Sequence, residues 1–310
     1  MKAKTDRRWN TLTFLAIAIL VASATIAKTP MTALASPVLG GIAVFGSGVT
    51  IGNSSKIGHP DPSSPVHSFI GGQILGETIS IGNATVVGDI YAADGNLTLG
   101  NYAKAFGVCS ILGGGLNLGT GASCISYDQG ADESLVDQAF IDASGSFYNF
   151  DIIVNVNCAT ATLGPQAVAA GKTKTIATTV AGFNLIQVDS VTLGNSSALT
   201  LSGGLGDSIL LHIMSDLTMG SGAHIRLTGG ITPSQVMIFV EQNSNFGNST
   251  GIAASVAMIG RLIAGGGTFI DGVALSVGGA TFGPNTTVTN NGLDINVPDP
   301  SPECQALHGY

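Results

Sequence analysis

The chain has 310 residues, and only 10% of them are charged, with 44 glycines and a mean hydropathy of +0.42. Residues 1–35 hold five of the eleven basic residues and one of the nineteen acidic ones, so residues 36–310 carry six basic against eighteen acidic residues, a formal charge of −12. Such a composition excludes a disordered acidic tail, and such a charge excludes a nucleic-acid-binding surface or one for anionic lipid.

The first 35 residues are typical of a secretory signal peptide. Lys2, Lys4 and the pair at 7 and 8 precede an apolar run over residues 12–27, and Ala33-Leu34-Ala35 offers a small-x-small cleavage site. The run is shorter than the 18 or more residues of a membrane span, although an uncleaved anchor is the alternative. We therefore expect the mature chain, residues 36–310, to be extracellular or at the cell surface without a membrane span.

Residues 36–130 repeat one phrase, an apolar-polar-apolar triplet followed by glycine. Examples are Val49–Gly52, Ile79–Gly82, Leu97–Gly100 and Leu116–Gly119, and the glycines at 82, 100 and 119 stand 18 and 19 residues apart. Period-2 alternation marks a strand, and the glycine marks a corner that needs either positive φ or close approach of another backbone. Self-similarity near 20 residues is typical of stacked repeats. The sequence therefore predicts a β-solenoid.

Cysteines at 109, 124, 158 and 304 follow a secretion signal, and their even number favours two disulfides. Cys109 and Cys124 flank one repeat, which favours their pairing and leaves Cys158 to hold the tail at Cys304. Zinc binding is the alternative, but no C-x-x-C pair and no nearby histidine pair accompany them.

Residues 131–146 change period. Leu135, Val136, Ala139, Phe140 and Ala143 share one helical face, acidic residues crowd the first turn, and a glycine follows at 145. We expect one amphipathic helix along the flank of the solenoid, and the alternative is a linker between domains.

Residues 147–297 return to strands. The richest stretch, Val191–Gly230, repeats the same phrase with marker glycines at 194 and 220, and several later strands are almost continuously apolar, as in strands that are covered on both faces. Residues 298–310 begin with Pro298-Asp-Pro-Ser-Pro, a stiff spacer. The predicted organisation is a signal peptide, solenoid repeats over 36–130, the helix, a second solenoid portion over 147–297 and the tail.

Within residues 180–290, the segments Leu199–Gly204, Ile209–Ala223, Leu227–Pro233, Val236–Val240 and Ile259–Ala264 resemble the ice-binding-like family. They also resemble bacterial choice-of-anchor A surface-protein domains. In the ice-binding-like family a discontinuous β-solenoid is flanked by one long helix, and many members have no demonstrated affinity for ice. The resemblance thus implies the fold more strongly than ice binding. The segment from Gly82 to Asn101 is also similar to polymer-forming, bactofilin-like repeats, although a signal peptide argues against a cytoskeletal role.

Catalytic patterns are weak throughout. Six Lys or Arg residues remain in the mature chain, and no acidic pair lies near them in any readable pattern, so a lyase or hydrolase solenoid is not favoured. No G-x-S-x-G motif is present. His212 and His224, at alternating positions in what we expect to be neighbouring strands, are better explained as isolated histidines. Asp89, Asp94, Asp207 and Asp216 suit ordinary turns better than calcium sites. We expect no enzyme activity, cofactor or bound metal.

The remaining candidate site is a surface. If the alternation is correct, one polar side chain per repeat points outward next to the marker glycine. The set comprises Thr50, Ser80, Thr98, Asn117, Thr192, Thr218 and Ser276. Such a ladder of hydroxyl and methyl groups can order water and match ice, but small residues also simply suit exposed strands.

Two functions stay open at this point. The first is a non-enzymatic bacterial surface or matrix protein whose solenoid binds carbohydrate, cells or other copies of itself. The second is an ice-binding protein that uses the ladder. Lys56 and Lys104, near the first repeats, weigh against a long uncharged face and so against the second reading.

Overall fold

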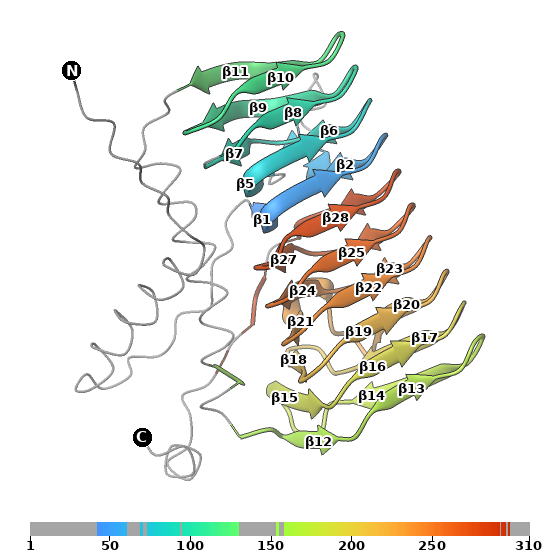
Figure 1. The fold of residues 1–310 in the computed structure, drawn as a ribbon. Helices are drawn as coiled ribbons and strands as arrows, with labels where there is room; N and C mark the ends of the chain where they lie inside the picture. Colours follow the sequence, from blue (N-terminus) through green and yellow to red (C-terminus); the bar gives the residue numbers. More distant parts are fainter. Residues whose placement is uncertain are drawn as a thin grey trace, which may run out of the picture. The chain divides into compact units, whose positions relative to one another are not determined.

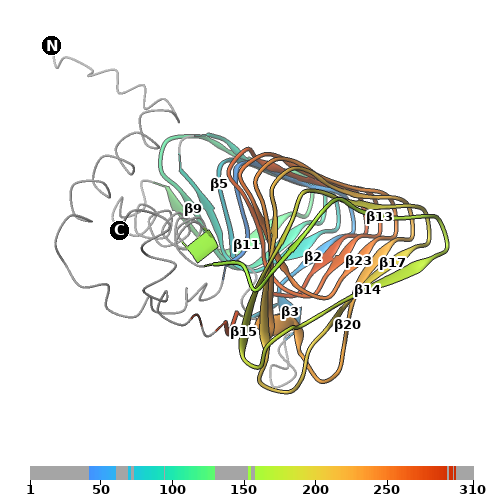
Figure 2. The same ribbon diagram turned by 90° about the horizontal axis from the view of Figure 1, so that it is seen from below.

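The computed structural model describes residues 42–60, 69–70, 73–93, 95–129, 153–154, 158–291, 293–295 and 297. All but two of its described strands belong to one 27-stranded sheet, which coils into a solenoid of triangular cross-section (Figures 1 and 2). The exceptions, β3 (His59–Pro60) and β4 (Phe69–Ile70), pair antiparallel with each other. The predicted all-β solenoid is therefore confirmed. The signal peptide, the helix over 131–146 and the tail over 298–310 lie outside the described residues.

Face A consists of the three-residue strands that the repeated phrase predicts, and each one pairs in parallel with the equivalent strand of the next coil. From one end to the other it contains β13 (Gln166–Val168), β16 (Val191–Leu193), β19 (Leu217–Met219), β22 (Ser244–Phe246), β25 (Leu262–Ala264), β28 (Ala280–Phe282), the second halves of β1 (Ile42–Ile51) and β5 (Gln73–Ile81), β8 (Leu97–Leu99) and β10 (Leu116–Leu118).

Face B follows each corner. Its members, in the same order, are β14 (Thr173–Ala177), β17 (Ala198–Ser202), β20 (His224–Thr228), β23 (Gly251–Ile252), β26 (Phe269–Ile270), β29 (Thr287–Val288), β2 (Lys56–Ile57), β6 (Val86–Val87) and the first parts of β9 (Lys104–Ile111) and β11 (Ser123–Gln129).

Face C closes the triangle. It is formed by β12 (Ala161–Leu163), β15 (Phe183–Val188), β18 (Ser208–Ile213), β21 (Val236–Val240) after the 3-10 turn η1 (Pro233–Gln235), β24 (Ser255–Met258), β27 (Ala274–Ser276), the first halves of β1 and β5, β7 (Ile90–Ala92) and the last parts of β9 and β11.

The order of the coils differs from the order of the sequence. The stack begins with β12–β14 and rises to β27–β29, and the coil that contains β1 and β2 then lies on top of β27–β29. The later N-terminal coils continue upward to β10 and β11 (Figure 1). The two predicted solenoid portions thus form one body that begins in its middle, which is the discontinuous solenoid that the family resemblance implied.

The alternation of inward and outward side chains along each strand determines which residues form the core. In the face A strands the first and third residues point inward, and Leu97, Leu99, Val191 and Leu193 are at most 1% exposed. Each such side chain contributes about 1.5–3 kcal/mol of burial free energy, so a few coils stabilise the stack substantially.

In its central strands, β18, β21, β24 and β27, face C is buried on both sides. Its inward residues belong to the central core, and the residues between them, including Leu210, Met237, Phe239 and Leu275, have no exposed surface either. This explains why the sequence of these strands is almost continuously apolar.

Candidate recognition face

The central residue of each face A strand points away from the core, and the sheet register stacks these residues into one column. In spatial order the column is Ala167, Thr192, Thr218, Asn245, Ile263, Thr281, Thr50, Ser80, Thr98 and Asn117. Neighbouring members are about 4.8 Å apart, so the ten rungs extend over about 43 Å. All ten are exposed or half-buried, and none is charged.

Six of the seven residues that the sequence placed in the ladder lie in this column. Thr50, Ser80 and Thr98 follow one another directly, and Thr192 and Thr218 are adjacent rungs in the lower half. The parallel pairing places both groups in one column, although residues 118–191 separate them in the chain.

Ser276 is the exception, and its assignment to the ladder was wrong. It lies at the end of β27 on face C, it has no exposed surface, and its hydroxyl donates to the carbonyl oxygen of Gly260 or Gly279, at 2.8 and 2.7 Å. The Leu275–Gly278 phrase copies the face A pattern, but the true face A strand of this coil begins five residues after Leu275, at Ala280.

Sequence reasoning missed Ala167, Asn245, Ile263 and Thr281. A usable signal existed for three of them, because an apolar or small residue and then glycine follow each one, as in Asn245-Phe246-Gly247 and Thr281-Phe282-Gly283. The repeated phrase has a large apolar residue on both sides of a polar one. Ser244 and Ala280 replace its first apolar residue, and Ile263 replaces its polar residue.

The two sides of the column differ in their residues. On one side stand the marker glycines, and on the other Gly48 and Gly279 leave a shallow groove of about 310 Å³ between Thr78 and Arg261. Arg261 is exposed at the edge of the face, so charge flanks the column without entering it.

Lys56 and Lys104 do not interrupt face A. They lie in β2 and β9 on face B, where each one is exposed. The sequence-based argument that these lysines shorten a flat uncharged face was therefore wrong, since the corner after each marker glycine turns them onto the next side of the triangle.

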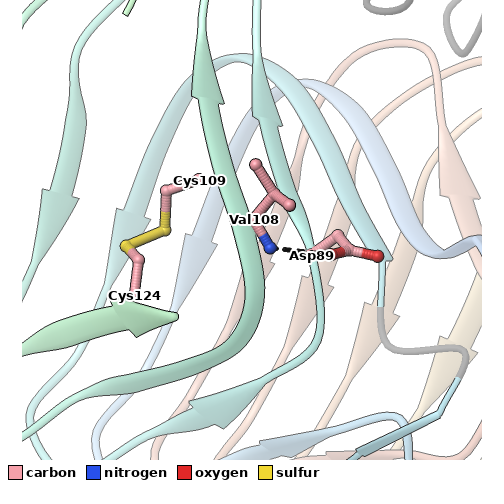
Figure 3. The surroundings of a disulfide bond; sticks show 4 residues. All are labelled: Asp89, Val108, Cys109 and Cys124. Carbon is pink, nitrogen blue, oxygen red and sulfur yellow. Dashed lines mark hydrogen bonds between the residues drawn. A yellow bond between two sulfur atoms is a disulfide. The ribbon is translucent and has the colours of Figure 1, made fainter. Parts of the chain in front are cut away.

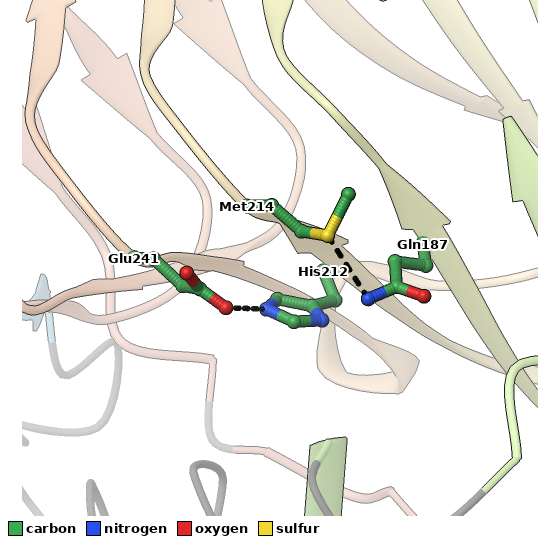
Figure 4. A network of polar contacts seen from close by, with 4 residues as sticks. All are labelled: Gln187, His212, Met214 and Glu241. Carbon is green, nitrogen blue, oxygen red and sulfur yellow. Dashed lines mark hydrogen bonds and ion pairs between the residues drawn. The ribbon is translucent and has the colours of Figure 1, made fainter. Parts of the chain in front are cut away.

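The sequence suggested that the two histidines lie in neighbouring strands, and this expectation was wrong. His212 lies in β18 on face C, where it is 4% exposed and its Nε2 is 2.8 Å from Oε1 of Glu241 (Figure 4). The centroid of the Phe239 ring is 5.7 Å from that of the His212 ring. Nearby, the Gln187 amide donates to the sulfur of Met214. His224 lies in β20 on face B, where burial and the charge of Arg226 lower its pKa. These histidines form no joint site.

The aspartates stabilise turns. Asp89 accepts the backbone N–H of Val108 at 2.8 Å, and Asp216 accepts that of Asn243 at 2.9 Å. Asp94 lies outside the described residues. Within the part of the chain that the structure describes, no three His, Cys, Asp or Glu side chains come together as a metal site, and no helix is long and apolar enough to cross a bilayer.

Cys109 and Cys124 form the disulfide that their positions favoured (Figure 3). It joins face C of the coil that contains β9 to face B of the last coil, so it links the two uppermost coils and closes part of the core at that end. Cys158 is disulfide-bonded as well, and its expected partner, Cys304, lies outside the described residues.

No protein-family model and no curated protein matches this sequence. Among solved structures, the fold is similar to that of an ice-binding protein from an Antarctic biological consortium, with a TM-score of 0.51, 19% identity and coverage of 86% of this chain and 96% of that one. Ice-binding proteins from the Antarctic ascomycete Antarctomyces psychrotrophicus (TM-score 0.44, 17% identity, 83% and 98% coverage) and from an Arctic yeast (0.48, 13%, 85% and 94%) also match. At this identity the likeness to the first structure shows the fold. None of these matches supports the choice-of-anchor A resemblance.

Proposed function

We propose that this protein is a non-enzymatic ice-binding protein and that face A is its ice-binding surface. The observation that carries the proposal is the ten-rung central column, which is uncharged and regularly spaced along its whole length. The fold likeness to an ice-binding protein supports it, since it favours this reading over adhesion among the two that the sequence left open.

The physical argument concerns water. Hydroxyl and amide groups at a fixed spacing hold waters at fixed positions, and the methyl groups of threonine beside them leave those waters no competing partners. The parallel ladder sets the spacing, and two buried side chains anchor every face A strand except β10, so the array is rigid before ice arrives. A pre-ordered surface loses little conformational entropy on binding.

Ile263 and Ala167 also belong to the column, and apolar side chains at these two positions are compatible with ice binding. Ile263 is 49% exposed and projects from β25 beside Thr281, so it offers a methyl surface of similar kind to the threonine methyls. Apolar groups in a flat face reject disordered water, while the hydroxyls anchor ordered water.

The setting that we propose is extracellular, because residues 1–35 have the pattern of a secretory signal peptide. A disulfide between the two uppermost coils suits an oxidising compartment.

The test uses purified residues 36–310 and measures thermal hysteresis and ice-crystal shaping. Thr218→Tyr places a ring in the middle of the lower half of the column, while the fold should change by no more than about 0.5 kcal/mol, as for most exposed sites. We expect a large loss of thermal hysteresis with an unchanged melting temperature.

The matched control is Thr175→Tyr, the same change at an exposed position of β14 on face B. It should keep full activity. A parent protein without thermal hysteresis or ice shaping would contradict the proposal and return the adhesion reading to first place, and equal losses in both variants would exclude face A as the binding surface.

A further inference from the structure

The unpaired strand edges at the two ends of the solenoid carry different side chains. At the upper end, the last coil contains β10 and the face B and face C parts of β11, and among the described strands β10 pairs only with β8 and β11 only with β9. One edge of each strand therefore presents backbone N–H and C=O groups without a strand partner, and such an edge is a template for pairing with another chain.

Side chains at the upper end are unusually apolar for an exposed surface. Leu118 continues the inward column that contains Leu99, yet it is 50% exposed where Leu99 is 1% exposed. Ile125 and Tyr127 of β11 are 71% and 42% exposed. Leu118 and Tyr127 pair with the buried residues Leu99 and Cys109, so they would be core residues if one more coil were stacked on them, while Ile125 lies at the corner.

The lower end is protected. Lys172 and Lys174 are exposed at the edge of β14, and the side-chain amide of Gln166 bonds back to the Gly164 carbonyl oxygen at 2.6 Å. Lysine at an edge strand opposes edge-to-edge pairing because the approaching chain would have to desolvate it. A molecule with one adhesive end and one protected end forms a closed pair and not a filament.

We propose that two copies of this chain associate through their upper ends, β10 against β10 and β11 against β11. A two-fold axis that passes through Asn117 on face A and through the corner at Ile125 relates the two copies. The strand register shifts at this corner, between Cys124 and Ser126, where β11 turns from face B to face C. The axis makes each edge antiparallel to itself, which satisfies the free backbone groups of both copies.

Charge is compatible with this arrangement. Asp128 is the one charged residue in β10 and β11, and the axis separates it from its copy, so no like charges oppose each other. Leu118 meets Leu116 of the other copy, and Ile125 lies on the axis itself. A second copy is the partner that fits, because it offers the same bent edge with the same apolar side chains.

The association has a consequence for face A, which rests on the proposed function. The axis passes through the middle of face A, so the central columns of the two copies join at Asn117 into one column of twice the length. The contact consists of the edges of two short strands, β10 and β11, whereas a typical stable interface buries roughly 800 Å² per partner, so we expect a concentration-dependent dimer.

Sedimentation velocity of residues 36–310 over a wide range of concentration tests the proposal. We expect the mass to rise from one copy to two and then to remain at two. The double variant Leu118→Lys/Ile125→Lys should stay monomeric at every concentration, with an unchanged circular dichroism spectrum and melting temperature. Val180→Lys, a matched change at a site that is 49% exposed outside the last coil, should dimerise like the parent.

A parent that is monomeric at all concentrations would overturn the proposal, as would masses that grow beyond two copies or an unchanged dimer in the double variant. If the double variant misfolds, Ile125→Ser alone replaces it. Mass and thermal hysteresis are read separately. A dimer without ice activity contradicts only the proposed function, and an ice-active protein that never dimerises contradicts only the association.

Discussion

Asp207 shows how a single side chain holds two coils in register. Its carboxylate accepts the backbone N–H groups of Gly182 and Gly204, both at 2.8 Å, and the hydroxyl of Thr178 at 3.1 Å. Gly182 and Thr178 belong to the coil below, so the contact joins neighbouring turns. The N–H of Gly182, then that of Gly204, lowers the pKa of Asp207, and burial opposes them. The sequence identified Asp207 as a turn residue but gave no sign of its partners.

We expect Asp207→Asn to lower the melting temperature at neutral pH. The folded-state pKa lies below the unfolded value of about 3.9, so the ionised carboxylate stabilises the fold above that pH, and this contribution disappears as the pH falls through the lower folded pKa. Melting curves of parent and variant should therefore differ at pH 7 and converge below about pH 3.9. Asp189→Asn is the control, since the Asp189 carboxylate has no hydrogen bond to a described residue, and a gap that persists in acid would refute the assignment.

At the scale of the element, the three-residue strand and its corner were largely predictable from the sequence. The buried-exposed-buried pattern of β8, β16 and β19 follows directly from one apolar-polar-apolar phrase. What the phrase cannot give is the face on which a strand lies, because an apolar-polar-apolar triplet also occurs on face C, as Leu275-Ser276-Val277. Ser276 was misplaced for this reason, and only stacking against Met258 and Gly46 decides its position.

The corners resolve a question that the sequence left open. The marker glycines do not have positive φ. The left-handed residue comes two positions later, at Ser54, Ala84 and Tyr102, with φ of 57°, 52° and 58°. A Cβ on Gly100 would meet Oδ1 of Asn83 at 2.6 Å and its nitrogen at 2.7 Å, so glycine is needed here for close approach. The same Asn83 oxygen accepts the N–H of Asn101, which links one corner to the next.

Gly100→Ala should therefore destabilise the protein by about 1–3 kcal/mol, as expected for overpacking against backbone. Gly48→Ala is the matched control, because a Cβ there has no atom within 4 Å and its φ is not positive. Urea denaturation compares the two free energies of unfolding. Equal stabilities would mean that the corners can shift apart, and that the glycine repeat has another cause.

At the scale of the whole molecule, the sequence predicted that coils stack but not in which order. Periodicity reports only neighbours along the chain, and the contact of β1 with β27 and β28 joins segments from opposite ends of the sequence. Any coil in this chain offers similar inward leucines and isoleucines, so the order depends on details of shape that a pattern does not contain.

This junction predicts that the chain can be cut and remain assembled. Cys109 pairs with Cys124 on one side of residues 131–146, and Cys158 lies on the other with Cys304 as the remaining cysteine, so no disulfide crosses that segment. The backbone bonds from Gly52 to Phe282 and from Lys56 to Thr286, both 2.8 Å, remain after cleavage. A protease site inserted within residues 131–146 should give two fragments that co-elute in native gel filtration and separate in denaturant. Fragments that separate without denaturant would show that the covalent link holds the stack.

The same junction affects how the chain folds while the ribosome synthesises it. The nitrogen of Thr286 bonds to the hydroxyl oxygen of Ser55, 231 residues earlier in the chain. A ribosome delivers Ser55 long before Thr286, so the lower edge of the first coil must wait uncovered while almost the entire remainder of the chain is made. Contacts of such long separation form slowly. The interval exposes a strand edge in the nascent chain, and a chaperone that covers this edge would find its substrate at the N-terminal coil, not at either end of the finished stack.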